Sequence, residues 1–252
     1  ILVICLFLPL DKGQAFAPGA DHLLYMVIQK IRQPAGMVAF QSRSILSPLR
    51  KPATAPGDEA EPPVQQALVL DEKLTYSSGF RLRSEFSFPG VSGFQVESES
   101  GFVRVENGRS VALEKSFLDY YTDVLLFRDY EELERKMAMD GVDTSRVAFR
   151  RYRGKVCFVI GSPSEPGRPF PGLWVERQSL FPVRYVLVKK GWVLEFSYEN
   201  WQQVSRTWYP MKTDIHMDGQ LMAQVRVNRV ALEPNVPLGL FQVQRIRDQY
   251  PT

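Results

Sequence analysis

Residues 172–241 read GLWVERQSLFPVRYVLVKKGWVLEFSYENWQQVSRTWYPMKTDIHMDGQLMAQVRVNRVALEPNVPLGLF. Apolar and polar side chains alternate along this stretch, and the alternation is broken at Phe181-Pro182, Lys190-Gly191, Tyr209-Pro210 and Asp218-Gly219. Alternation between Pro and Gly breakers is typical of antiparallel strands whose two faces differ. The stretch therefore predicts one wall of a β-sheet, with an apolar face that another part of the chain must cover.

The two faces of this predicted wall differ in composition. The apolar face carries Tyr185, Leu187, Leu194, Phe196, Tyr198, Met211, Ile215, Met217, Leu221, Ala223, Val225 and Val227. The opposite face carries Arg184, Glu195, Lys212, Asp214, His216, Gln220, Gln224 and Arg226. A face rich in aromatic residues and methionine is ordinary in a packed core, and it also suits an irregular apolar ligand.

Two other segments predict helices that could cover the apolar face. Residues 20–31 place apolar side chains at helical spacing, and residues 116–140 predict two short helices broken near Arg128-Asp129. Short alternating segments within residues 37–113 predict further antiparallel strands. With 252 residues and 44% hydrophobic content, the chain is long enough to bury a sizeable core. We expect an α+β fold, mainly antiparallel β, with its helices on one face of the sheet.

The ends of the predicted domain follow from composition. The apolar run at residues 1–8, followed by Ala15-Phe16-Ala17, predicts residues 1–17 to be a secretory signal peptide whose start is missing and which is cleaved after Ala17. Residues 18–252 then form a single domain in which the Pro-rich segment 47–63 is a mobile loop. Cleavage would leave Cys157 as a buried, inert thiol without a disulfide partner.

No constellation of residues in the sequence indicates catalysis, a metal or a cofactor. His22 and His216 have no Cys, Asp or Glu at metal-ligand spacing, and Ser162 lacks the Gly-x-Ser-x-Gly context of a nucleophile. The net charge of +3 is interspersed along the chain, and the basic hairpin at residues 146–155 favours a solvated surface over a nucleic-acid patch. We therefore expect a non-enzyme that binds no nucleic acid.

The order of the motifs resembles the LolA-like, lipoprotein-sorting carrier superfamily. In the amino-terminal half the resemblance rests on Gln41-Ser42-Arg43 and Phe80-Arg81-Leu82-Arg83-Ser84-Glu85. In the carboxyl-terminal half it rests on Leu173-Trp174-Val175-Glu176, Phe181-Pro182-Val183-Arg184-Tyr185, Tyr198, Tyr209-Pro210, Val230, Asn235-Val236-Pro237 and Phe241. The resemblance covers nearly the whole chain after residue 17, except the Pro-rich segment.

The resemblance implies an unclosed, curved half-barrel whose concave apolar face is lidded by helices and binds acyl chains in the periplasm. The implied lid residues are Leu24, Val27, Ile28, Tyr120, Tyr121 and Val124. The implied ligand-binding residues are Trp174 and the twelve residues of the apolar face named above. Of these, Tyr185, Leu187, Phe196, Met211, Ile215 and Val225 should point into one cavity, with Arg184, Glu195, Lys212 and His216 pointing away.

The function that the resemblance implies is a periplasmic carrier or chaperone for a lipid or lipoprotein acyl chain, with an inner-membrane donor and an outer-membrane acceptor as partners. The chain departs from the dedicated carriers at the turn of residues 76–79, which lacks their lid-holding arginine. One alternative is an envelope-stress sensor or protein-interaction module built on the same half-barrel. A secreted hydrolase is a further alternative.

Overall fold

The computed structural model of the protein describes residues 17–32, 34–46, 67–112, 115–127, 129–163 and 167–251. The predicted signal peptide, apart from Ala17, and the predicted loop at residues 47–63 lie outside these residues. In the part of the chain that is described, no helix has both the length and the apolar character needed to cross a membrane.

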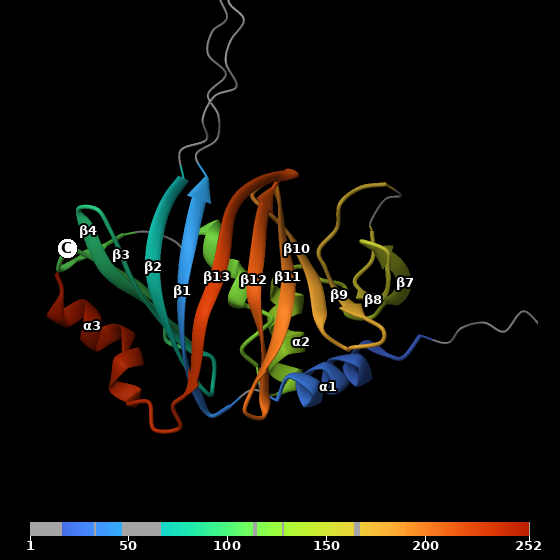
Figure 1. Ribbon diagram of the computed structural model, residues 1–252, viewed down its shortest axis with the longest axis horizontal. Coiled ribbons are helices and arrows are strands. Elements are labelled where there is room, and N and C mark those ends of the chain that lie inside the picture. The colour runs from blue at the N-terminus through green and yellow to red at the C-terminus, as the bar shows by residue number, and fades with distance from the viewer. Residues whose placement is uncertain are drawn as a thin grey trace, which may run out of the picture.

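All the described strands belong to one antiparallel sheet of 13 strands, which is curved and does not close (Figure 1). The strand order is β6-β5-β4-β3-β2-β1-β13-β12-β11-β10-β9-β8-β7. Two meanders, β1 to β6 and β7 to β13, are therefore joined in the middle of the sheet, where the first strand pairs with the last. The predicted α+β, unclosed half-barrel is confirmed.

The strands are β1 (Gly36–Leu46), β2 (Ala67–Ser77), β3 (Arg81–Phe88), β4 (Val91–Ser98), β5 (Gly101–Glu106), β6 (Arg109–Val111), β7 (Val147–Tyr152), β8 (Lys155–Ile160), β9 (Gly172–Glu176), β10 (Pro182–Lys189), β11 (Trp192–Val204), β12 (Thr207–Met217) and β13 (Gln220–Leu232). The helices are α1 (Ala20–Ile31), the 3-10 helix η1 (Phe117–Thr122), α2 (Tyr130–Met139), the 3-10 helix η2 (Leu238–Phe241) and α3 (Val243–Gln249).

The connection between the two meanders forms most of the cover over the sheet. It carries η1 and α2, and α1 packs beside α2 below the strands (Figure 1). Asp129 caps α2 by accepting a hydrogen bond from the Glu131 amide, which satisfies one of the amides that a helix start leaves free. We call α1, η1, α2 and the turn between η1 and α2 the lid, and the sheet face beneath it the inner face.

Two helices, η2 and α3, lie on the opposite, outer face of the sheet. Val243 and Ile246 of α3 pack with Val96, Val103 and Val105 of β4 and β5 in an apolar cluster separate from the main core. The sequence predicts helices on one face of the sheet only, and this prediction is therefore wrong for η2 and α3. The reason is that β4 and β5 present valines outward, and the carboxyl terminus of the chain folds back to bury them.

Candidate functional site

The inner face is built from alternate residues that strand pairing brings into rows. Tyr185 lies opposite Phe196, Phe196 opposite Ile215, and Ile215 opposite Ala223, so one row crosses β10 to β13. These four side chains are at most 1% exposed. Because side chains alternate between the faces of a strand, this register places a continuous apolar surface on one side of the sheet.

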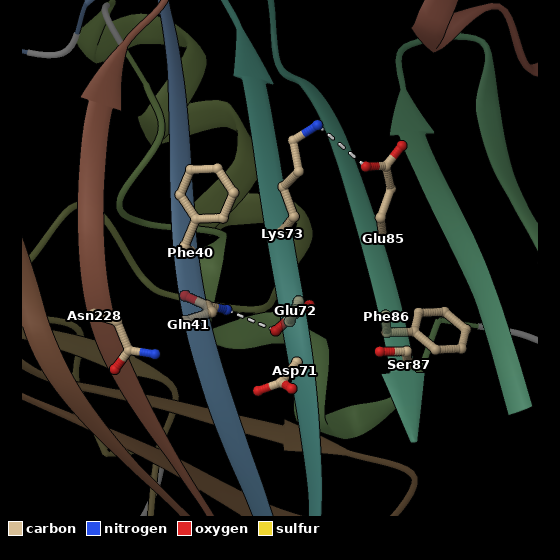
Figure 2. A pocket seen from close by; sticks show the side chains of 9 residues that line it. All are labelled: Phe40, Gln41, Asp71, Glu72, Lys73, Glu85, Phe86, Ser87 and Asn228. Carbon is tan, nitrogen blue, oxygen red and sulfur yellow. Dashed lines mark hydrogen bonds and ion pairs between the residues drawn. The ribbon is translucent and has the colours of Figure 1, made fainter. Parts of the chain in front are cut away.

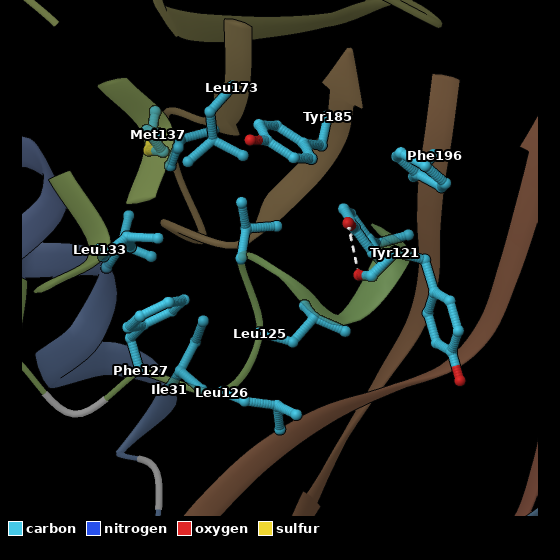
Figure 3. Packing of buried hydrophobic residues seen from close by; sticks show 14 of the residues in the cluster. Ile31, Tyr121, Leu125, Leu126, Phe127, Leu133, Met137, Leu173, Tyr185 and Phe196 are labelled. Carbon is cyan, nitrogen blue, oxygen red and sulfur yellow. Dashed lines mark hydrogen bonds between the residues drawn. The ribbon is translucent and has the colours of Figure 1, made fainter. Parts of the chain in front are cut away.

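The lid fills the space above this surface with its own apolar side chains. Tyr121, Leu125, Leu126 and Phe127 are almost fully buried and belong to the same core cluster as the inner face (Figure 3). The ring of Phe127 also stacks on that of Phe80, with 5.0 Å between the ring centroids. The lid thus packs directly against the inner face, and its apolar side chains share one core with the strands.

Most of the residues expected on the inner face lie in or against this core. Those buried in the main cluster are Tyr185, Leu187, Leu194, Phe196, Tyr198, Ile215, Ala223 and Val225, while Met217 and Val227 pack against it. The six expected lid residues also lie in or against it: Leu24, Val27, Ile28, Tyr120, Tyr121 and Val124.

Trp174 is a correction to the expected set. It lies opposite Arg184 in the pairing of β9 with β10 and packs in an outer-face cluster with Cys157 and Val186. The Arg184 guanidinium stands 4.6 Å from the centre of the Trp174 ring. Its two neighbours, Leu173 and Val175, are the residues of this strand that belong to the core under the lid.

Met211 and Leu221 are the other two departures from the expected set. Both are half-buried, and neither belongs to the core under the lid. A register shift between Ile215 and His216 places Leu221 opposite His216 rather than in the inward row. Such a shift changes the face to which a side chain points, because the period of a strand is two residues.

A buried polar network interrupts the apolar inner face where β1 and β2 meet η1. Arg43 donates to Asp119 of η1 at 2.6 Å and to both Glu72 carboxylate oxygens at 2.9 and 3.0 Å. The side chains of Arg43, Glu72 and Asp119 are 7%, 2% and 7% exposed. Arg43 thereby connects the sheet to the lid through a charge that is shielded from water.

Two further side chains complete the network. Gln41 donates to Glu72 at 2.6 Å and lies 2.5 Å from the hydroxyl of Tyr121, and Ser84 donates a short hydrogen bond to Glu72. This network was not predicted from the sequence, although Gln41 and Arg43 are part of the motif on which the family resemblance rests. The sequence nevertheless contains a signal for an inward-facing Arg43. Gln41, Arg43 and Ile45 are two residues apart on one strand and share a face, so if the apolar Ile45 points inward, Arg43 does too.

A second set of ion pairs ties the lid to β4. Lys115 bridges Asp123 of the lid and Glu97 of β4, at 2.6 Å in both cases. Lys136 of α2 approaches Asp123 from the other side at 2.7 Å. Asp123 is fully buried, so its charge depends on these two lysines. Burial opposes protonation of Lys115, but the carboxylates of Asp123 and Glu97 outweigh it and raise its pKa.

The same set of ion pairs reaches β10 through the end of α2. Asp140 lies 2.5 Å from Lys136 and 2.8 Å from Lys189 of β10, and it accepts a hydrogen bond of 3.0 Å from the Tyr185 hydroxyl. The lid is therefore attached to both halves of the sheet by polar contacts that can separate without breaking a covalent bond.

The acid-base behaviour of these contacts gives the first prediction. Burial alone would raise the pKa of Asp119 and of Asp140, but Arg43 and Lys136 respectively outweigh it, so both pKa values lie below the usual range. Carboxyls with a lowered folded pKa stabilise the fold above the unfolded value, about 3.9, and lose this contribution as the pH falls through the folded value. We expect acidification below about pH 4 to lower the protection factors for amide exchange in η1 and α2 before those in β10 to β13. An equal loss of protection in lid and sheet would contradict this.

The metal, thiol and basic-hairpin candidates considered from the sequence are not assembled into a reactive site among the described residues. Among the residues described, no group of three or more His, Cys, Asp or Glu side chains is placed to hold a metal. Cys157 is buried as expected, and this burial raises the pKa of its thiol. In the basic hairpin, Arg153 pairs with Glu199 and Lys155 with Glu176, so part of its charge is neutralised.

The outer face has a shallow pocket of about 410 Å³ (Figure 2). Phe40, Lys73 and Glu85 stand on neighbouring strands along it, and Lys73 and Glu85 form an ion pair of 3.3 Å. Phe40 is 39% exposed there. Polar residues dominate its lining, so this pocket differs in character from the surface beneath the lid.

Comparison with known proteins supports the fold. The sequence matches no protein-family profile and no curated protein. Solved structures do resemble the chain, and three of them are each 10–11% identical to it in sequence. They are a putative outer membrane lipoprotein-sorting protein domain from Vibrio parahaemolyticus (TM-score 0.55, covering 90% of this chain and 97% of that one), a DUF1329 family protein from Desulfovibrio piger (0.56, 90% and 97%) and a LolA superfamily protein from Nitrosomonas europaea (0.57, 91% and 100%). The resemblance that the sequence indicated is therefore confirmed at the level of the fold, which is that of the LolA-like lipoprotein-sorting proteins.

Proposed function

We propose that this protein is a periplasmic carrier that holds an acyl chain of a lipid or lipoprotein between the inner face and the lid, without covalent chemistry. The observation that carries the proposal is the apolar row of Tyr185, Phe196, Ile215 and Ala223, which lies beneath a lid held to the sheet by separable ion pairs. The solved structures with this fold include a putative lipoprotein-sorting domain, which agrees with such a role.

Binding would exchange one set of apolar contacts for another. An acyl chain that enters beneath the lid takes the place of Leu125, Leu126 and Phe127 against the sheet. Removing a methylene from water contributes about 0.8 kcal/mol, so a chain of a dozen methylenes offers roughly 10 kcal/mol before the lid and the ligand are reorganised. That gain is large enough to offset the loss of several lid contacts. A carrier of this kind would load at an inner-membrane donor and unload at an outer-membrane acceptor.

The proposal is tested by asking what the protein holds and what it takes up. We expect protein purified from the periplasm of its own cells to release acyl-bearing molecules on solvent extraction, identified by mass spectrometry. We also expect the emptied protein to take up the uncharged apolar fluorophore N-phenyl-1-naphthylamine and to release it to competing acyl chains. An empty extract together with no uptake would exclude the carrier function. Recovery of a stable protein partner without lipid would instead favour an envelope sensor.

A further inference from the structure

A second pocket, of about 160 Å³, opens on the inner face beside the lid, between β1 to β5 and η1. Its walls include Leu68, Leu70 and Phe88, and its floor is the buried network of Arg43, Glu72 and Asp119. Leu68 is 41% exposed, whereas the floor side chains are nearly inaccessible. The pocket is thus apolar where it opens and polar at its base.

The floor keeps hydrogen-bonding capacity that the described residues do not use. Arg43 Nε has no hydrogen-bond partner among them, and neither has Asp119 Oδ2. The amide of Gln95 is near enough to lower the pKa of Asp119, yet it does not donate to Oδ2 in hydrogen-bond geometry. Buried polar atoms are normally paired because an unpaired donor or acceptor costs free energy. The two residues that carry this spare donor and this spare acceptor therefore both line the same pocket.

The charges of the floor disfavour an anion. Arg43 is the one cation of the floor described above, and it faces two carboxylates, Glu72 and Asp119. Arg104, on the wall, is already engaged by Glu106 at 2.7 Å and by Gln95 at 3.2 Å. A third carboxylate brought into this space would be buried against like charges with no free cation to pair with it, which is strongly unfavourable.

From these observations we infer that the pocket takes the neutral polar head of an amphiphile, a hydroxyl or an amide, while rejecting carboxylate heads. A hydroxyl or an amide both donates and accepts, so it matches in kind the spare acceptor of Asp119 and the spare donor of Arg43. The hydrocarbon next to the head meets Leu68, Leu70 and Phe88. This inference rests on the proposed function and specifies which class of acyl-bearing molecule the carrier holds.

The test compares ligands that share one chain and differ in the head. Lauroyl glycerol, lauramide and laurate are titrated against protein loaded with N-phenyl-1-naphthylamine. We expect the two neutral ligands to displace the fluorophore at concentrations at least about tenfold lower than laurate, because laurate alone would bury an unpaired charge. The ranking of lauroyl glycerol and lauramide then separates a hydroxyl head from an amide head. Laurate that binds as tightly as both neutral ligands overturns the inference and leaves the carrier function standing, whereas no binding of any chain overturns both.

Three variants locate the selectivity in this pocket. Asp119→Asn removes one charge from the floor of the pocket. We expect it to lower the ratio of the laurate concentration to the lauroyl glycerol concentration needed to displace the fluorophore. This ratio does not depend on how easily the lid opens, because both ligands share that step. Leu68→Trp places a large ring at the exposed opening, where folding is not at risk, and should also bring the ratio towards one. Glu85→Gln, with the same charge change on the outer face, should leave it unchanged. An unchanged ratio in Leu68→Trp and Asp119→Asn would place the selectivity elsewhere.

Discussion

Replacing Arg43 with leucine is expected to lower the free energy of unfolding by about 3–5 kcal/mol and to release the lid. The substitution leaves Glu72 and Asp119 buried with no cation between them. Breaking a buried ion pair from one side is costly because the remaining charge stays desolvated. Urea denaturation measures the stability, and hydrogen exchange of the η1 amides reports the release of the lid.

Two matched variants separate the charge effect from the loss of a long side chain. Arg229→Leu removes an exposed outer-face arginine that lies over Phe40, so its stability should change by no more than about 0.5 kcal/mol. Adding Glu72→Gln and Asp119→Asn to Arg43→Leu removes the unpaired charges, and this triple variant should be more stable than Arg43→Leu alone. A triple variant that is less stable than Arg43→Leu would show that the network does not act through its charges.

Truncation of the lid should move stability and ligand affinity in opposite directions. Leu125 is 1% exposed and packs in the core beneath the lid, so Leu125→Ala is expected to lower the free energy of unfolding by about 2–5 kcal/mol. The same change leaves apolar space beside the inner face, and it weakens the contacts of the lid that an acyl chain must displace. Displacement of the fluorophore should therefore require several-fold less lauroyl glycerol than in the unaltered protein.

The control for this prediction lies in the outer-face cluster. Ile246→Ala in α3 also removes a buried aliphatic group, and Ile246 is 6% exposed. It should lower stability without changing the affinity for acyl chains, because α3 does not touch the inner face. If both variants raised the affinity, general loosening of the protein would explain the result better than competition with the lid.

Alternation in the sequence was sufficient to locate the inner face. In β11 and β12 one face is apolar and the other carries polar side chains, such as the ion pair of Lys212 with Glu199 at 2.9 Å, so the two faces are easily told apart. In β9 this contrast disappears, because Leu173, Trp174 and Val175 are all buried. With both faces covered, the pattern cannot tell which of them points to the lid, and this explains the misplacement of Trp174.

Other features depend on contacts that a single sequence does not display. The shift that moves Leu221 out of the inward row is set by pairing between β12 and β13, not by either strand alone. The role of Arg43 requires Glu72 and Asp119, which lie 29 and 76 residues away in the chain. The helices of the lid could be predicted from their periodicity, but the ion pairs that hold the lid depend on the folded arrangement.

Methyl NMR shows whether acyl chains bind against the inner face after the lid moves. Protein with labelled Ile, Leu and Val methyl groups is mixed with lauroyl glycerol, and contacts between ligand and protein protons are recorded as nuclear Overhauser effects. We expect contacts from the acyl chain to Leu187, Ile215 and Val225, together with changed signals from Leu125 of the lid. Contacts confined to outer-face groups such as Val69 and Leu240, with the lid signals unchanged, would contradict it.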